Sequence, residues 1–209
     1  MISILIPIKK ISQRTPNKNY RDFNGVPLWE HTIRKFEHFN VFVDTDDSDL
    51  ILELKKYRHV TAYQRSIELI GHKVSVCHLI QNWVSIFNPQ GFLFQIHVTS
   101  PFLNPQTLLI AKNSLGAHDS VVSCDIHYKR FWHNNIPVNH DPINLVQTQE
   151  LTPLYEENSL FYGFTKDLAQ KGRRIGDNPL FILTDPVESL DIDTERDWEQ
   201  CLQLQKSFT

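Results

Sequence analysis

The chain has 209 residues, with 21 Lys and Arg against 24 Asp and Glu, and its formal net charge is -3. Hydrophobic residues make up 41% and charged residues 22%, which is ordinary for a globular protein. This length predicts a single domain over 1–209 that buries a core without disulfide or metal staples. The near-neutral charge offers no basic surface of the kind that nucleic acids require, so we expect no nucleic-acid partner.

The three cysteines, Cys77, Cys124 and Cys201, are widely spaced and never form a CxxC pair. Their pattern fits neither a disulfide framework nor a zinc knuckle, and it favours buried free thiols in a reducing compartment. The apolar run 2–8 is too short to span a membrane, and its positive charges follow it, whereas a secretory signal carries them in front. We therefore expect a cytoplasmic protein with no membrane partner.

Strand-like and helix-like patterns alternate along the first 125 residues. Short β-branched apolar runs predict buried strands, and apolar residues at helical spacing predict the helices between them. In chain order the expected elements are strand 2–8, polar loop 9–27, helix 28–39, strand 41–43, a helix from 47 or 48 to about 57, helix 74–87, strand 92–98, helix 105–115 and strand 120–124. Short connections between them predict right-handed βαβ units on a parallel sheet.

The alternation stops after Asp125. Residues 126–157 are rich in aromatic, His, Asn and Pro residues but have no helical period, which predicts an extended or hairpin insertion. Strand character resumes at 160–164 and at 181–183, and a closing helix is expected at 194–205. The insertion therefore interrupts a single α/β domain near its middle.

The loop after the first predicted strand is rich in cations. Within ten residues it carries Lys9, Lys10, Arg14 and Lys18. Ligands of α/β sheets bind beyond the carboxyl ends of the strands, so this loop lies where a ligand is expected. Together with the donors of Ser12 and Asn19, its charges suit a polyphosphate, although a solvated charged loop explains them equally well. The chain contains no GxGxxG, GxxxxGK[ST], HExxH or GxSxG motif.

A second chemical motif is the run Ser189-Leu-Asp-Ile-Asp-Thr194. Apolar and acidic residues alternate in it, so in extended geometry the carboxylates of Asp191 and Asp193 lie on one face. Two such carboxylates repel unless a cation lies between them, and a Mg²⁺ ion that keeps waters and binds phosphate oxygens suits the pair. The alternative is that Asp193 or Thr194 caps the last helix; capping by Thr194 is compatible with a metal at the aspartates.

Segments along nearly the whole chain resemble the acylneuraminate cytidylyltransferases, the CMP-sialic acid synthetase family. The run Ile6-Pro7-Ile-Lys9-Lys-Ile-Ser12-Gln-Arg14-Thr-Pro16-Asn-Lys18-Asn19 is similar to the opening motif of the family. The run 189–197 is similar to its Ser-Ile-Asp-Ile-Asp-Thr motif with the later Asp. Shorter similarities follow the same order at 25–28, 31–33, 43–47, 65–69, 99–101 and 158–162. The first and last similarities are the specific ones.

The resemblance implies an α/β fold: a three-layer, nucleotide-diphospho-sugar-transferase-like (Rossmann-like) domain with a mixed, mainly parallel sheet. It also implies that 126–157 is a dimerisation arm that reaches toward the sugar site of the partner in a homodimer. Tyr128, Phe131 and Trp132 would then be exposed in a monomer. The implied reaction joins a 2-keto sugar acid, either a sialic acid or a related nonulosonic acid, to CTP and yields a CMP-sugar and pyrophosphate.

The resemblance also implies roles for individual residues of this chain. The residues expected in catalysis are Lys18, Asn19 and Arg14. The residues expected to bind the nucleotide are Lys9, Ser12, Arg14 and Arg65. The residues expected on the sugar side are His97, Ser100, Gln149 and Tyr162, of which His97 and Tyr162 have purely structural alternatives. The expected ligands of the Mg²⁺ cofactor are Asp191 and Asp193.

Several positions depart from the family pattern. Lys9 stands where Arg is usual, Lys10-Ile11 replaces a Gly pair, and His97 replaces a Gln. Further departures are Gln13 for Lys, Thr148-Gln149 for Arg-Gln, and Ser159 for Gly. The changes in the first loop leave a non-catalytic nucleotide-binding relative as one alternative, against which the carboxylate pair argues. A nucleotidyltransferase for another sugar acid, such as a 3-deoxy-octulosonate, is the other alternative; Lys18-Asn19 argues against it, because that branch usually has Lys-Pro there.

Overall fold

The architecture is described by a computed structural model, which covers residues 1–12, 15–71 and 73–208. In this part of the chain seven strands form one sheet in the order β3-β2-β1-β4-β8-β5-β9. Their bounds are β1 Ile2–Ile8, β2 Asn40–Thr45, β3 Val60–Gln64, β4 Phe92–Ile96, β5 Ser120–His127, β8 Leu154–Phe164 and β9 Pro179–Leu183. All neighbours are parallel except β8, which runs antiparallel to both β4 and β5. The expected mixed, mainly parallel sheet is confirmed.

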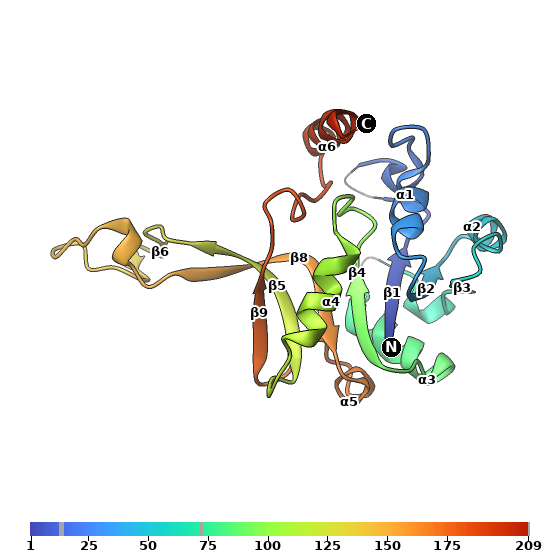
Figure 1. Cartoon of the computed structure of the whole chain (residues 1–209), viewed down its shortest axis with the longest axis horizontal. Coiled ribbons are helices and arrows are strands. Elements are labelled where there is room, and N and C mark those ends of the chain that lie inside the picture. The colour runs from blue at the N-terminus through green and yellow to red at the C-terminus, as the bar shows by residue number, and fades with distance from the viewer. Residues whose placement is uncertain (13–14, 72, 209) are drawn as a thin grey trace.

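Helices cover both faces of the sheet (Figure 1). Their bounds are α1 Leu28–Lys35, α2 Ser48–Leu54, α3 Val76–Phe87, α4 Pro105–Asn113, α5 Lys166–Gln170 and α6 Glu195–Ser207. In β1 the side chains of Ile4, Ile6 and Ile8 join the core beneath α1, α2, α4 and α6, whereas Leu5 joins the core beneath α3 and α5. This alternation is the two-residue period of a strand buried on both faces. It confirms the three-layer fold.

The arm is built from the outer halves of two long strands. β5 and β8 continue to pair beyond the body of the domain, after a register irregularity between Val122 and Cys124. Figure 1 shows the resulting ribbon standing out from the sheet, with β6 (Trp132–His133) and β7 (Ile136–Pro137) beyond it. The segment 126–157 is therefore extended and hairpin-like. Its exposed apolar side chains are Tyr128, Trp132, Ile136, Val138, Ile143, Leu145, Val146 and Tyr155.

The sequence patterns do not predict β3 or α5. β3 is an edge strand whose residues are half-buried or exposed, so it lacks a continuous apolar run. α5 is only five residues long and therefore shows no period. Two of the three expected buried thiols, Cys124 and Cys201, are buried, and Cys77 is half-buried. No helix in the described ranges is long and apolar enough to cross a bilayer.

The topology brings two loops together at one edge of the sheet. β1 lies between β2 and β4, and the chain reaches these two neighbours in opposite directions from β1. Such a switch point opens a crevice at the carboxyl ends of the central strands. The loop after β1, which contains the short 3-10 helix η1 (Lys18–Tyr20), and the loop after β4 therefore border the same space.

Candidate active site

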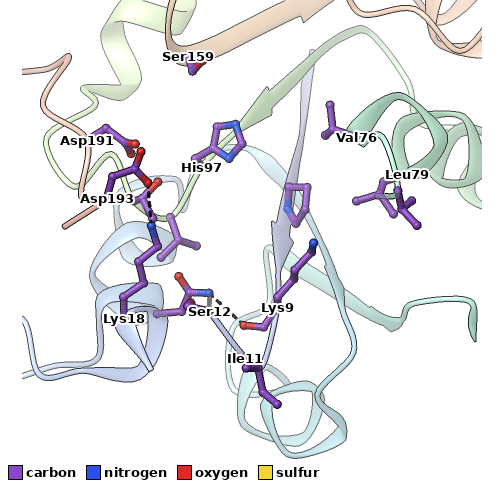
Figure 2. A pocket seen from close by; sticks show the side chains of 15 residues that line it. Lys9, Ile11, Ser12, Lys18, Val76, Leu79, His97, Ser159, Asp191 and Asp193 are labelled. Atoms are coloured by element: carbon purple, nitrogen blue, oxygen red, sulfur yellow. Dashed lines mark hydrogen bonds and ion pairs between the residues drawn. The ribbon is translucent and has the colours of Figure 1, made fainter. Parts of the chain in front are cut away.

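A cavity of about 460 Å³ lies beyond the carboxyl ends of β1 and β4. Its walls come from the loop after β1, the start of α3, the loop after β4, β8 and the segment before α6 (Figure 2). The residues expected from the sequence that line it are Lys9, Ser12, Lys18, Asn19, His97, Asp191 and Asp193. Segments almost 200 positions apart along the chain therefore meet where a ligand was expected.

Polar contacts of Lys9 and Asn19 hold the loop after β1 in place. The side-chain amide of Asn19, a buried residue, donates a hydrogen bond to the carbonyl of Lys9 over 3.1 Å. The ammonium of Lys9 donates to the carbonyl of Gly71 over 3.0 Å, which links this loop to the segment before α3. Each side chain thus fixes part of the cavity wall in addition to lining it.

Lys10 is held away from the cavity, in contrast to Lys9 and Lys18 of the same loop. Its ammonium lies 2.9 Å from Asp47 and 3.3 Å from Asp49, and its backbone N–H donates to Asp46 over 2.7 Å. Tyr20, at the other end of the loop, donates to Asp47 over 2.8 Å. Burial would raise the pKa of Asp47, but the hydrogen bonds from Lys10 and Tyr20 hold that pKa below its usual range. The ammonium of Lys10 therefore links the loop after β1 to the acidic residues that follow β2.

The segment before α6 is anchored to both loops. The backbone N–H of Ile192 donates to the carbonyl of Thr99 over 2.9 Å, and the hydroxyl of Thr15 donates to the carbonyl of Asp193 over 2.8 Å. The ammonium of Lys18 donates to the carbonyl of Ile192 over 2.6 Å and lies 3.3 Å from the carboxylate of Asp193. Lys18, whose side chain is only 13% exposed, therefore ties the first motif to the last one.

Helix capping and the carboxylate pair are separate features of this segment. Thr194 is the N-cap of α6 and forms a capping box with Asp197. Ile192 is fully buried, while Asp191 and Asp193 both line the cavity, as the alternating pattern predicts. Of the two alternatives for the cap that the sequence left open, the structure shows Thr194.

The residues present fit a Mg²⁺ ion. No cluster of three or more His, Cys, Asp or Glu side chains occurs within the described ranges, so they form no complete protein cage for a metal. Mg²⁺ does not need such a cage, because it commonly takes one or two carboxylates and completes its shell with water and phosphate oxygens. Asp191 and Asp193 supply that donor set at the wall of a cavity that is open to a ligand.

His97 follows β4, and its ring projects into the cavity from the side of the sheet that carries α3 (Figure 2). Burial lowers the pKa of His97 to about 4, and the charges of Arg174 and Lys18 act in the same direction. The imidazole is therefore neutral at pH 7. A neutral imidazole has one nitrogen that donates and one that accepts.

Three other expected site residues that the structure describes do not line the cavity. Ser100 is buried, and Tyr162 is buried in β8, where its hydroxyl lies 2.9 Å from Glu157 and 3.2 Å from Ser159. Gln149 is exposed in the 3-10 helix η3 (Thr148–Glu150) of the arm. Arg14, expected both in catalysis and in nucleotide binding, lies outside the described residues.

Arg65 also lies outside the cavity lining. Its side chain is fully buried and forms an ion pair with Asp44, and it donates a further hydrogen bond to the backbone carbonyl of Asp44 over 3.0 Å. Burial raises the pKa of the Asp44 carboxyl, and the guanidinium opposes that shift. The structure thus gives Arg65 a packing and charge-pairing role between β2 and the chain that follows β3.

Sequence reasoning missed several residues that shape the site. Gln95 is fully buried in β4 and contacts His97, and Ser159 lines the cavity with a backbone φ of 59°. A Gln inside the apolar run 92–96 was a usable signal, because a buried strand seldom carries an amide without a partner. Arg174, which contacts Gln95, lies in a loop and gave no such signal.

The mixed sheet places a cation-bearing loop and a carboxylate pair around one cavity at the switch point, an arrangement suited to a nucleoside triphosphate and its metal ion. The family model described as Cytidylyltransferase matches residues 3–208. The chain therefore belongs to the cytidylyltransferase family, and it is a CTP-dependent nucleotidyltransferase.

Curated relatives agree with this assignment. A pseudaminic acid cytidylyltransferase of Campylobacter jejuni is 24% identical over 175 residues, which cover 76% of this chain and 75% of the relative. An N-acylneuraminate cytidylyltransferase of Streptococcus agalactiae is 24% identical over 210 residues, which cover 93% of this chain and 51% of the relative. The resemblance to acylneuraminate cytidylyltransferases is therefore confirmed.

Solved structures share the fold. A CMP:2-keto-3-deoxy-manno-octonic acid synthetase complexed with CTP has a TM-score of 0.71 at 14% identity, covering 100% of this chain and 99% of that one. A 4-diphosphocytidyl-2C-methyl-D-erythritol synthase from Anaerococcus prevotii has a TM-score of 0.67 at 13% identity, covering 98% and 96%. At these identities the likeness establishes the fold and leaves the acceptor open.

Proposed function

We propose that this cytidylyltransferase transfers CMP from CTP to a 2-keto sugar acid of the nonulosonic type and releases pyrophosphate. The observation that carries the proposal is the cavity in which Lys9, Ser12 and Lys18 face Asp191 and Asp193. The two cations and the hydroxyl suit a triphosphate, and the two carboxylates, of which Asp193 lies 3.3 Å from Lys18, suit Mg²⁺. The names of the curated relatives, which specify pseudaminic acid and N-acylneuraminate, support an acceptor of this class.

The reaction we propose is an in-line displacement at phosphorus. The anomeric hydroxyl of the sugar acid attacks the α-phosphorus of CTP, the bond to the bridging oxygen breaks, and pyrophosphate leaves. Lys9 and Lys18 would offset the charge that develops on the phosphates, and Ser12 would donate to a phosphate oxygen. Bound Mg²⁺ would neutralise charge and orient the α-phosphate from Asp191 and Asp193.

Lys18 is suited to this role because its position is already fixed. An ammonium has three donors, and Lys18 directs two of them at the carbonyl of Ile192 and the carboxylate of Asp193. One N–H therefore remains for a phosphate oxygen. Because the side chain is held by backbone and carboxylate groups, little rotamer entropy is lost when the phosphate binds.

A pyrophosphate-release screen tests the proposal. We expect Mg²⁺-dependent release when CTP is combined with a nonulosonic acid, and little release when ATP, GTP or UTP replaces CTP. The panel should include a 3-deoxy-octulosonate, because turnover of that acid alone would favour the second acceptor class. Reactions without sugar acid and reactions with a metal chelator serve as controls. Absence of release from every pair would contradict the proposal and favour a non-catalytic nucleotide-binding relative.

We also propose that the arm makes the protein a homodimer. The support is the set of apolar side chains along 126–157, which a monomer leaves in water; Trp132 is 56% exposed and Ile143 is 88% exposed. The edge strand β9 adds Phe181, whose ring stacks on Tyr155 of the arm. A dimer formed by the arm would carry Gln149 toward a partner, as the resemblance implies.

Light scattering checks this assembly. We expect a dimer at micromolar concentration and a monomer when Trp132→Asp and Ile143→Asp are combined, because two charges would enter an apolar interface. Ile110→Asp is the matched control: Ile110 is a similarly exposed apolar residue that lies on α4, away from the arm. A wild-type monomer, or a dimer that survives the paired substitution, would rule out the arm as the interface.

A cytoplasmic location is part of the same proposal. It is supported by the cysteine usage: Cys77, Cys124 and Cys201 are all free, and two of the three are buried. Free thiols persist in reducing compartments, whereas secreted domains tend to pair them. Fractionation of the source cells would test the location, and recovery of the enzyme outside the cytoplasm would contradict it.

A further inference from the structure

Gln95 connects His97 to an arginine that lies outside the cavity lining. Its side chain is fully buried in β4. The Oε1 atom lies 2.8 Å from Nη1 of Arg174, and the Nε2 atom lies 2.9 Å from Nε2 of His97. A buried amide between two ring or guanidinium nitrogens has little freedom, because each of its ends must meet a partner of the opposite hydrogen-bonding type.

Two contacts set the orientation of this amide: Arg174 donates to its oxygen, and the carbonyl of Ile96 accepts from its NH₂ group over 3.3 Å. Arg174 can only donate hydrogen bonds, so the oxygen of Gln95 must face it and the NH₂ group must face His97. Nε2 of His97 is then the acceptor of that NH₂ group. In a neutral imidazole the proton consequently lies on Nδ1. The tautomer of the ring therefore follows from the hydrogen-bonding types of Arg174 and of the Ile96 carbonyl, through the amide of Gln95.

Arg174 is itself held by packing. Its guanidinium carbon lies 3.5 Å from the ring centroid of Tyr162, in the geometry of a cation–π contact. Tyr162 is the register partner of Gln95 across β4 and β8 and is almost fully buried. The hydroxyl of Tyr162 contacts Glu157 and Ser159. The expected sugar-side residue Tyr162 therefore lies in this network and acts on the cavity through its neighbours.

Nδ1 of His97 is open to the cavity. Among the residues that the structure describes, none forms a hydrogen bond with this atom. The atom is also not fully enclosed by protein. His97 lines the cavity together with the carboxylate pair and Lys18 (Figure 2). The Nδ1–H group is thus a donor that the protein leaves available for a ligand.

We propose that Arg174 and Gln95 are positioning residues that lock His97 as the Nδ1–H tautomer, so that its ring donates a hydrogen bond to a carboxylate or hydroxyl oxygen of the sugar acid. The inference rests on the proposed function for the identity of the ligand, whereas the tautomer follows from this chain alone. Burial and the nearby cations lower the pKa of His97 to about 4, which agrees with a ring that stays neutral.

Nitrogen-15 NMR of the ligand-free enzyme at pH 7 tests the tautomer. His97→Gln removes one ring system from the spectrum and so assigns it. We expect a protonated, pyrrole-type Nδ1 and an unprotonated, pyridine-type Nε2 for this ring. Gln95→Glu should reverse the pattern, because a carboxylate still pairs with Arg174 but can only accept from the ring. The opposite tautomer in the wild type would overturn the proposal, whatever the enzyme's substrate is.

Steady-state kinetics test the donor role. Arg174→Met should raise the KM for the sugar acid about tenfold, the loss of one well-placed hydrogen bond, while kcat and the KM for CTP stay near wild type. Arg173→Met is the matched control, because that guanidinium binds Asp177 and the carbonyl of Ile175 instead. In a His97→Gln background the new amide has an NH₂ donor that depends on no tautomer, so Arg174→Met should have little further effect.

The possible failures can be told apart. If the expected tautomer is found but neither Gln95→Glu, which reverses it, nor Arg174→Met raises the KM for the sugar acid, the donor role is overturned and the proposed function stands. If no sugar acid turns over, the proposed function fails, the donor role fails with it, and the NMR experiment still decides the tautomer. Thermal melting of each variant shows whether a raised KM reflects a loss of fold.

Discussion

Replacing either Asp191 or Asp193 by Asn is expected to lower turnover about a hundredfold or more, because one stabilising charge in a transition state is typically worth on the order of 3 kcal/mol. Asn keeps the size of the side chain and one oxygen but removes the charge that Mg²⁺ requires. The remaining carboxylate does not replace the lost anion. The fold should survive, since the cap of α6 is formed by Thr194 and Asp197.

The measurement is pyrophosphate release at saturating CTP over a Mg²⁺ titration, together with thermal melting. Glu195→Gln is the matched control: it removes a carboxylate from the same segment that binds Arg21 at the surface, so turnover should remain and stability should change by about 1 kcal/mol or less. Normal turnover of Asp191→Asn or Asp193→Asn at limiting Mg²⁺ would show that the carboxylate concerned is no ligand.

The two ends of the site were predictable because each has a local pattern. The apolar run of β1 followed by cations defines a strand and the loop beyond its carboxyl end. The alternation around Ile192 assigns both aspartates to one face without knowledge of the fold. Their meeting at one cavity follows from the parallel topology, and residues of both the first and the last motif line it.

The remaining features depend on contacts between distant residues. Lys10 looked like one of four equivalent cations, but the acidic turn after β2 binds it and leaves Lys9 and Lys18 to the cavity. Nothing within the loop distinguishes these lysines. Ser159 stands where the family has Gly and nevertheless keeps a φ of 59°. A non-glycine residue in this conformation costs about 1 kcal/mol, so the surrounding strands must impose it.

Arg65 is the clearest divergence between motif and structure. In the segment that resembles Ser-Thr-Asp-Asp, this chain carries Asp44 at the position of the Ser. The structure pairs that extra carboxylate with the guanidinium of Arg65, and both side chains are 0% exposed. A motif gives the residue types within one segment, but it does not show which charged side chain of another segment each residue contacts in the fold. In this structure the guanidinium of Arg65 contacts that carboxylate, whereas the resemblance implies a contact with the nucleotide or the leaving phosphate.

Asp44→Ala is therefore expected to lower the free energy of unfolding by about 3–5 kcal/mol, because removal of one partner leaves an uncompensated buried charge. Arg65→Met should have a similar effect for the same reason. The combined Asp44→Leu, Arg65→Met variant should recover most of the loss. In the described part of the chain, Oδ2 of Asp44 and Nη1 of Arg65 are buried without hydrogen-bond partners. Because the pair leaves part of its hydrogen-bonding capacity unused, replacing both side chains by apolar ones should cost little free energy of unfolding.

Urea unfolding of the three variants measures these stabilities, and the combined variant also separates structure from ligand binding. Because Arg65 does not line the cavity, we expect this variant to bind CTP with an unchanged KM once its fold is restored. A raised KM for CTP in a stable protein would instead mean that the pair opens and that Arg65 contacts the nucleotide, as the resemblance implies. Single variants as stable as the wild type would contradict the buried pair itself.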